Sequence, residues 1–70
     1  MRDTKTYYVT GEHEQWKVRG AFSTKDIIIG NREEVIEEIY YLAEKSERDI
    51  SIVIINEDGT EEERRFFGEL

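Results

Sequence analysis

The chain has 70 residues, with 17 acidic against 10 basic side chains, a formal net charge of −7 and no cysteine. Seventy residues make one domain, so we expect residues 1–70 to form a single unit in which residues 1–5 fray. The lack of cysteine excludes disulfides and thiolate zinc sites, and so acidic a surface would be repelled by nucleic acid and by anionic membranes.

No apolar run approaches the length of a membrane span, and the first residues lack the apolar core of a signal peptide. We therefore expect a cytoplasmic protein with no membrane partner and no direct nucleic-acid partner. A domain of this size buries only about 60% of its unfolded surface, so its stability is marginal without help. With disulfides and thiolate zinc sites excluded, oligomerisation is the usual means of stabilising a small domain that remains.

The first half of the chain predicts two or three short strands. Thr6–Thr10 is rich in β-branched and aromatic residues, and a turn is expected at Gly11–Glu14. Gln15–Phe22 alternates apolar and polar residues, as a half-buried strand does. Lys25–Ile29 is either a third strand or the far end of a bent second one.

One helix is predicted after Gly30. Asn31 has the chemistry of an N-cap, and Glu34 stands three residues later, where a capping box places its carboxylate. An apolar stripe follows at helical spacing: Val35, Ile36, Ile39, Leu42 and Ala43. On a helical wheel Tyr40 lies at the edge of this stripe and Tyr41 points well away from it.

The last part of the chain predicts a β-hairpin. Ile50–Asn56 is apolar on both faces, and Glu57–Gly59 is a turn signal that leads into a strand at Glu61–Phe67. The predicted order is β-β-(β)-α-β-β. This is an α+β fold in which a small antiparallel sheet of four to five strands carries one helix on one face.

The chain resembles domain-of-unknown-function family 2188, a family of small bacterial and phage proteins. The matching features are the helix at Glu34–Glu44 and, in order along the chain, Thr6-Tyr7-x-Val9, Trp16-x-Val18, Asp58-Gly59 and Phe67-Gly68. The resemblance implies a small ββαββ domain. It supplies no catalytic residues, because the family has no established chemistry.

No cluster of side chains predicts catalysis, a metal or a cofactor. His13 has no second histidine to share a metal with, so we interpret it as a solvated turn residue. Ser23, Ser46 and Ser51 are near no histidine in any plausible arrangement, which argues against a serine nucleophile. A solvent-facing row of carboxylates is predicted on the helix: Glu33, Glu34, Glu37 and Glu38. Paired carboxylates need a pocket that shifts one pKa before they can act as acid and base.

The favoured function is a small, non-enzymatic interaction module that forms a homodimer. A symmetric dimer would hide the surplus apolar surface of the two-faced strand and of the aromatic end of the chain. The side chains predicted to make self-association or partner contacts are Tyr41, Ile28, Val53, Ile55, Phe66 and Phe67.

The alternative is an acidic inhibitor or nucleic-acid mimic, such as a phage protein that binds a basic cleft on a host protein. Its recognition face would consist of Glu33, Glu37, Glu44, Glu61, Glu62 and Glu63. A mimic needs these carboxylates on one face with the cations elsewhere. Arg64 and Arg65 directly follow the last three of them, which weighs against this alternative.

Overall fold

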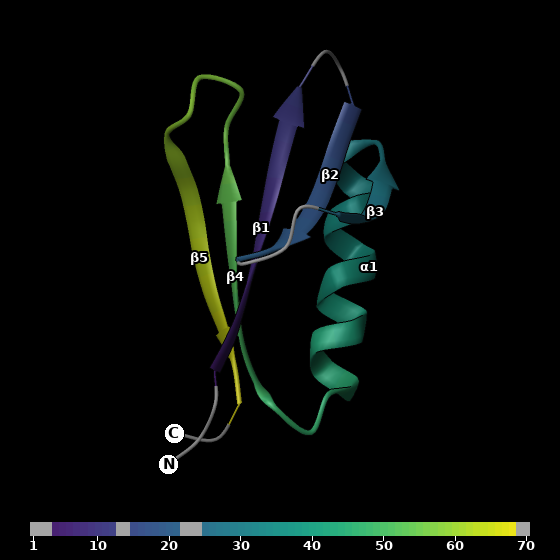
Figure 1. Cartoon of the computed structure of the whole chain (residues 1–70), viewed down its shortest axis with the longest axis vertical. Coiled ribbons are helices and arrows are strands. Elements are labelled where there is room, and N and C mark those ends of the chain that lie inside the picture. Colours follow the sequence, from purple (N-terminus) through teal and green to yellow (C-terminus); the bar gives the residue numbers. More distant parts are fainter. Residues whose placement is uncertain (1–3, 13–14, 22–24, 69–70) are drawn as a thin grey trace.

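A computed structural model describes residues 4–12, 15–21 and 25–68, which form one helix and a five-stranded mixed sheet (Figure 1). The predicted α+β class is confirmed. The elements in chain order are β1 (Thr4–Glu12), β2 (Gln15–Gly20), β3 (Asp26–Gly30), α1 (Arg32–Lys45), β4 (Asp49–Ile55) and β5 (Glu61–Phe67). Thr4 and Lys5, which we expected to fray, belong to β1.

The strands lie in the order β3-β2-β1-β4-β5, with the first and last strands of this order at the edges. Neighbouring strands are antiparallel except β1 and β4, which are parallel. The sheet is therefore mixed, whereas we predicted an antiparallel one. The reason lies in the connections. Two antiparallel pairings make β3 parallel to β1, and a helix returning across the sheet then places β4 parallel to both.

The start of α1 matches its prediction. The Asn31 side chain accepts a hydrogen bond from the backbone N–H of Glu34 at 2.9 Å, and its amide donates to the Glu34 carboxylate at 2.8 Å. The first bond satisfies one of the backbone N–H groups that a helix N-terminus leaves without partners, and the second joins the two side chains. The predicted N-cap is confirmed.

The buried stripe of α1 is narrower than predicted. Val35, Ile39 and Ala43 are buried, and Tyr40 is half-buried on the flank that faces β5. Leu42 was assigned to the stripe but is 46% exposed. It lies on the opposite flank of the helix from Tyr40, outside the strip that the sheet covers.

The helix covers one face of the sheet, and the core lies between them. Val9 on β1 pairs with Val18 on β2 and with Ile54 on β4, so these three side chains share that face. Trp16 belongs to the same core and is only 9% exposed. The core residues of the strands are Val9, Trp16, Val18, Ile28, Ile50, Ile52 and Ile54.

The predicted hairpin between β4 and β5 is also confirmed. Gly59 has a φ of +90°, a conformation that L side chains rarely adopt, and its N–H donates to the Asn56 carbonyl at 2.9 Å. The Asn56 N–H donates to the Thr60 carbonyl at 2.8 Å, which closes the turn.

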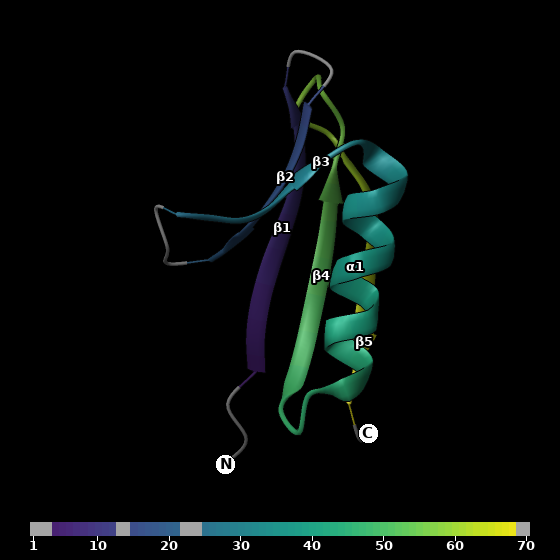
Figure 2. The ribbon, with the colours of Figure 1, turned by 90° about the vertical axis from the view of Figure 1, so that its right-hand side faces the viewer.

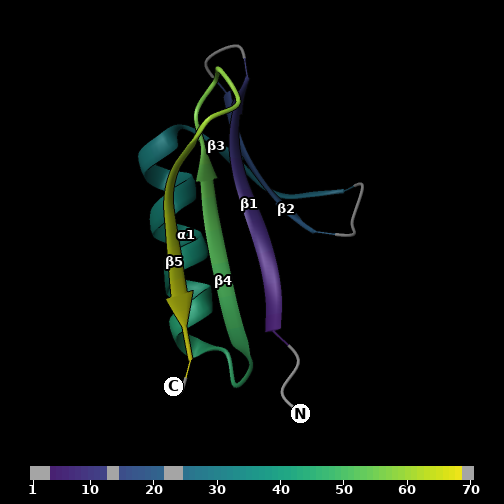
Figure 3. The same ribbon diagram turned by 90° about the vertical axis from the view of Figure 1, so that its left-hand side faces the viewer.

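The β2–β3 hairpin bends away from the helix, so its outer part projects from the uncovered side of the sheet (Figures 2 and 3). The uncovered side is called the open face below. The backbone N–H of Ala21 donates to the Thr6 carbonyl at 2.9 Å and ties the end of β2 to β1.

Candidate interaction surface

The centre of the open face is a row of three side chains from neighbouring strands. The register places Val53 on β4 opposite Tyr8 on β1 and opposite Arg64 on β5. The guanidinium of Arg64 donates to Glu61 at 2.8 Å, which raises the pKa of Arg64, and Tyr8 adds a smaller contribution in the same direction. Tyr8 and Arg64 therefore lie on either side of Val53 on the same face of the sheet.

Val53 was predicted as a contact residue, but it is only 2% exposed. This prediction is wrong, because β4 is a central strand and the long side chains of Tyr8 and Arg64 flank the small valine. The position of β4 within the sheet nevertheless explains why the Ile50–Asn56 segment is apolar on both faces. One face of β4 meets the helix, and the other is shielded by its neighbours within the sheet.

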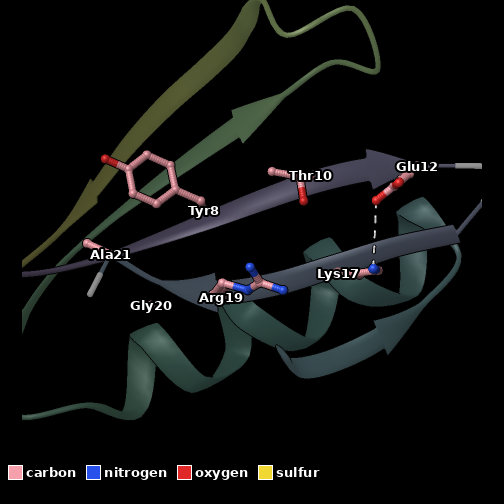
Figure 4. Close-up of a pocket in the computed structure, with 7 residues that line it drawn as sticks. All are labelled: Tyr8, Thr10, Glu12, Lys17, Arg19, Gly20 and Ala21. Carbon is pink, nitrogen blue, oxygen red and sulfur yellow. Dashed lines mark ion pairs between the residues drawn. The ribbon is translucent and has the colours of Figure 1, made fainter. Parts of the chain in front are cut away.

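A hollow of about 360 Å³ lies beside this row, over β1 and β2 (Figure 4). Its lining is Tyr8, Thr10, Glu12, Lys17, Arg19, Gly20 and Ala21. Lys17 Nζ lies 3.8 Å from the Glu12 carboxylate, as the dashed line in Figure 4 marks, and 3.9 Å from that of Asp26. Arg19 donates to Asp26 through Nη2 at 2.8 Å and through Nε at 3.0 Å. The cations of the hollow already hold carboxylate partners, so an anionic ligand would have to displace them.

The edge strand β3 exposes two of its three isoleucines. Ile27 is 52% exposed and Ile29 is 56% exposed, whereas Ile28 is 9% exposed and packs in the core under the helix. The prediction of an exposed contact side chain is wrong for Ile28, which faces the helix because its register partner Val18 does, although its backbone lies at the edge of the sheet. Of the three consecutive isoleucines, the prediction from the sequence selected the one whose side chain is buried.

The aromatic end of β5 divides between core and surface. Phe67 is half-buried against the core, and its ring centroid lies 5.4 Å from that of Tyr40. Its ring therefore contributes to packing against the helix, and its predicted role as a contact residue stays a prediction. Phe66 points to the other face, opposite Ser51, and is 43% exposed.

The two remaining predicted contact residues lie on different parts of the molecule. Tyr41 is 55% exposed on the helix, with Lys45 Nζ 4.5 Å from its ring centroid. Ile55 is half-buried on the open face, where it pairs with Thr10. The six predicted contact residues therefore do not form one patch: one lies on the helix, three lie on the open face and two lie in or against the core.

The six carboxylates predicted as an acidic recognition face are all exposed, but those on β5 are interleaved with cations. Glu61 accepts from Arg64, Glu62 pairs with Arg32 at the helix start, and Glu63 accepts from the Tyr40 hydroxyl at 2.9 Å. The hydrogen bond from Arg64 holds the pKa of Glu61 below its usual value. The other three, Glu33, Glu37 and Glu44, lie exposed on the helix. The mixing on β5 weighs against a nucleic-acid mimic.

Within residues 4–12, 15–21 and 25–68, no three side chains suited to binding a metal ion cluster together. His13 lies outside these ranges, so its predicted role as a turn residue is not addressed by them. No described helix is long and apolar enough to cross a membrane.

Comparisons with protein-family models, with curated proteins and with solved structures gave no match. The resemblance to family 2188 therefore stays a prediction.

Proposed function

We propose that this protein is a non-enzymatic interaction module that acts as a homodimer. The observation that carries the proposal is the exposure of Ile27 and Ile29 on one five-residue edge strand. Apolar side chains gathered at one site on a small surface mark a contact region more often than single scattered ones do. A chain of 70 residues also gains stability from burying such a region against a second copy.

The hollow on the open face also favours contact over turnover. Lys17 and Arg19 form ion pairs there with Asp26, and Lys17 also lies near Glu12. A general base or nucleophile acts through a pKa moved toward neutrality by its surroundings. Among the described residues, the carboxyl groups whose pKa values shift are Asp58 and Glu61, and both shift downward, which keeps them ionised.

Sedimentation equilibrium, or light scattering after size exclusion, tests the proposal over a range of micromolar concentrations. We expect a mass approaching twice the monomer mass of 8.3 kDa at the upper end, with dissociation on dilution. Raising the salt concentration should leave the dimer intact, because apolar contact is not screened. A monomer at every concentration would overturn the proposal. A dimer that dissociates as salt rises would show that charge pairing, and not apolar burial, holds the copies together.

A further inference from the structure

We propose that the second copy binds along the free edge of β3, so that two five-stranded sheets join into one continuous sheet of ten strands. This inference rests on the proposed function and specifies the surface that carries it. The two β3 strands would run antiparallel, related by a two-fold axis at Ile28 or at Ile29. Ile29 of both copies would then lie close together on the open face.

The two edges of the sheet differ in their fitness for pairing. Both β3 and β5 pair with a neighbour on one side only, so the backbone N–H and C=O groups of their outer sides face no strand of this sheet. β5 begins with five consecutive charged residues, Glu61–Arg65, all exposed. Charged side chains on an edge oppose the approach of another strand. β3 has the sequence Asp26-Ile-Ile-Ile-Gly30 and no lysine or proline, which are the residues that usually protect an edge.

The faces of β3 are compatible with symmetric pairing. Ile29 pairs with Lys17, whose neighbours Trp16 and Val18 face the helix, so Ile29 points to the open face. In an antiparallel pair, residues opposite each other point to the same face. Joining two β3 strands therefore brings apolar side chains together on the open face. It keeps both Ile28 side chains, and both helices, on the other face.

An irregularity in β3 limits where this pairing takes place. Val18 and Arg19 are consecutive on β2, but their partners on β3 are Ile28 and Asp26, so Ile27 is an extra residue in the ladder. An extra residue of this kind disturbs local pairing. The regular part of the strand is Ile28–Gly30, which is why the axis is placed at Ile28 or at Ile29 and not nearer Asp26.

Charge repulsion between two copies is weaker at this end of the sheet than elsewhere. Residues 15–30 contain three basic side chains, Lys17, Arg19 and Lys25, and one acidic side chain, Asp26, so their net charge is 3 − 1 = +2. The rest of the chain then carries −7 − 2 = −9. Two copies that meet through β3 keep their most acidic parts apart, whereas contact through β5 or the helix would bring carboxylates together.

Cross-linking at single cysteines tests the geometry, because the chain has no cysteine of its own. The three variants are Ile29→Cys on β3, Tyr41→Cys on the helix and Phe66→Cys at the far side of the open face. The wild-type side chains are 56%, 55% and 43% exposed, so all three substitutions should leave the fold intact. Each purified variant is treated with a short bis-maleimide, and the cross-linked fraction is measured after denaturation.

We expect Ile29→Cys to be captured as a covalent dimer, and the other two variants to remain mostly single chains. Opposite or diagonal positions on neighbouring strands are about 5 to 8 Å apart, within reach of a short cross-linker in either register. Efficient cross-linking through Phe66→Cys alone would indicate that two open faces stack, and cross-linking through Tyr41→Cys alone a helix-mediated dimer. Either outcome would overturn the β3 inference and leave the homodimer proposal standing. Pairing of β3 with β5, which does not close, would leave Ile29→Cys without cross-links and would give species larger than a dimer in light scattering of the wild-type chain.

A lysine substitution gives an independent test, in which the dimer dissociation constant is obtained from the mass of the species in solution. Ile29→Lys should raise the dimer dissociation constant about tenfold or more, because each copy then brings a charge to the shared edge. Tyr41→Lys is the matched control, with the same new residue at an equally exposed position, and should leave the constant unchanged. Equal effects of the two variants would contradict pairing through β3. If the wild-type chain is monomeric, the proposed function itself fails, and that outcome is separate from both comparisons.

Discussion

Gly11 lies directly opposite Trp16 in the β1–β2 ladder, and the indole ring lies against the glycine. A Cβ atom at Gly11 would be 2.6 Å from Trp16 Cε2 and 2.7 Å from Cζ2, closer than real contacts allow. The Arg32 guanidinium carbon is 5.5 Å from the centroid of the same ring. The ring of the only tryptophan in the sequence thus lies between Gly11 on β1, which has no side chain, and Arg32 at the start of the helix.

Gly11→Ala should therefore destabilise the protein. The added methyl group forces the indole ring to move within a packed core, which typically costs about 1–3 kcal/mol. Chemical denaturation followed by the fluorescence of Trp16 measures the loss and also reports the altered surroundings of the ring. Thr10→Ala, at the adjacent position on the open face, is the control and should cost less. Equal stability of Gly11→Ala and the wild type would mean that the ring is not held as described.

The side chain of Asn31 provides a second prediction. Asn31→Ala removes the acceptor for the Glu34 N–H and should cost about 0.5–2 kcal/mol in the free energy of unfolding. Asn31→Ser keeps an acceptor at this position without placing a second carboxylate beside Glu34, and should recover most of the loss. The comparison is made by urea denaturation followed by far-ultraviolet circular dichroism. A serine variant as unstable as the alanine variant would argue against capping as the cause.

The turn between β4 and β5 predicts an acid-dependent contribution to stability. The Thr60 hydroxyl donates to Asp58 at 2.6 Å and the Thr60 N–H donates at 2.9 Å, and these bonds hold the pKa of Asp58 below 3.8. A lowered pKa in the folded state stabilises the protein above the unfolded pKa, and this contribution is lost as pH falls through the folded value. Nuclear magnetic resonance titration of the Asp58 carboxyl group should give a midpoint below 3.8. In Thr60→Val, which keeps only the backbone donor, the midpoint should rise.

Tyr40 predicts the opposite dependence on pH. Partial burial, followed by the hydrogen bond to Glu63, raises the pKa of its hydroxyl above 10.0. Its contribution to stability is therefore complete below pH 10.0 and is lost as pH rises through the higher folded value. Tyr40→Phe keeps the ring against Phe67 but removes the hydroxyl, and should cost about 0.5–1 kcal/mol at neutral pH.

A double-mutant cycle with Glu63→Ala, which removes the acceptor, tests whether this loss comes from the bond between Tyr40 and Glu63. If the hydroxyl acts through its bond to Glu63, the two single losses should not add in the double variant. Additive losses would show that Tyr40 and Glu63 contribute separately. A phenolate absorbance titration would show the late-titrating tyrosine in the wild type and its absence in Tyr40→Phe.

The elements that sequence reasoning predicted well are those fixed by neighbouring residues. The cap at Asn31 depends on Glu34 three positions away, and the hairpin turn depends on the glycine at 59 that accepts a positive φ. Such signals are contained in a few consecutive residues. The order of the helix and strands followed from them and from the alternation of apolar residues.

The features that sequence reasoning missed depend on residues far apart in the chain. Whether Val53 is exposed depends on Tyr8 and Arg64, which come from strands at the two ends of the sequence. Which isoleucine of β3 is buried depends on the extra residue at Ile27 and on the side where the helix packs. Periodicity cannot choose among three consecutive isoleucines, because each of them is equally apolar.

The parallel pairing of β1 with β4 also determines how the chain can fold. Thr4 pairs with Asp49, so the central ladder of the sheet joins the beginning of the chain to a strand that follows the helix. Closing so long a loop costs entropy before any contact repays it, and folding slows as the sequence separation of contacts grows. The hairpins of β1–β2 and β4–β5 can form locally, but neither has a complete core until the central ladder joins them. Small as it is, this domain should fold in a single late, cooperative step that requires nearly the whole chain.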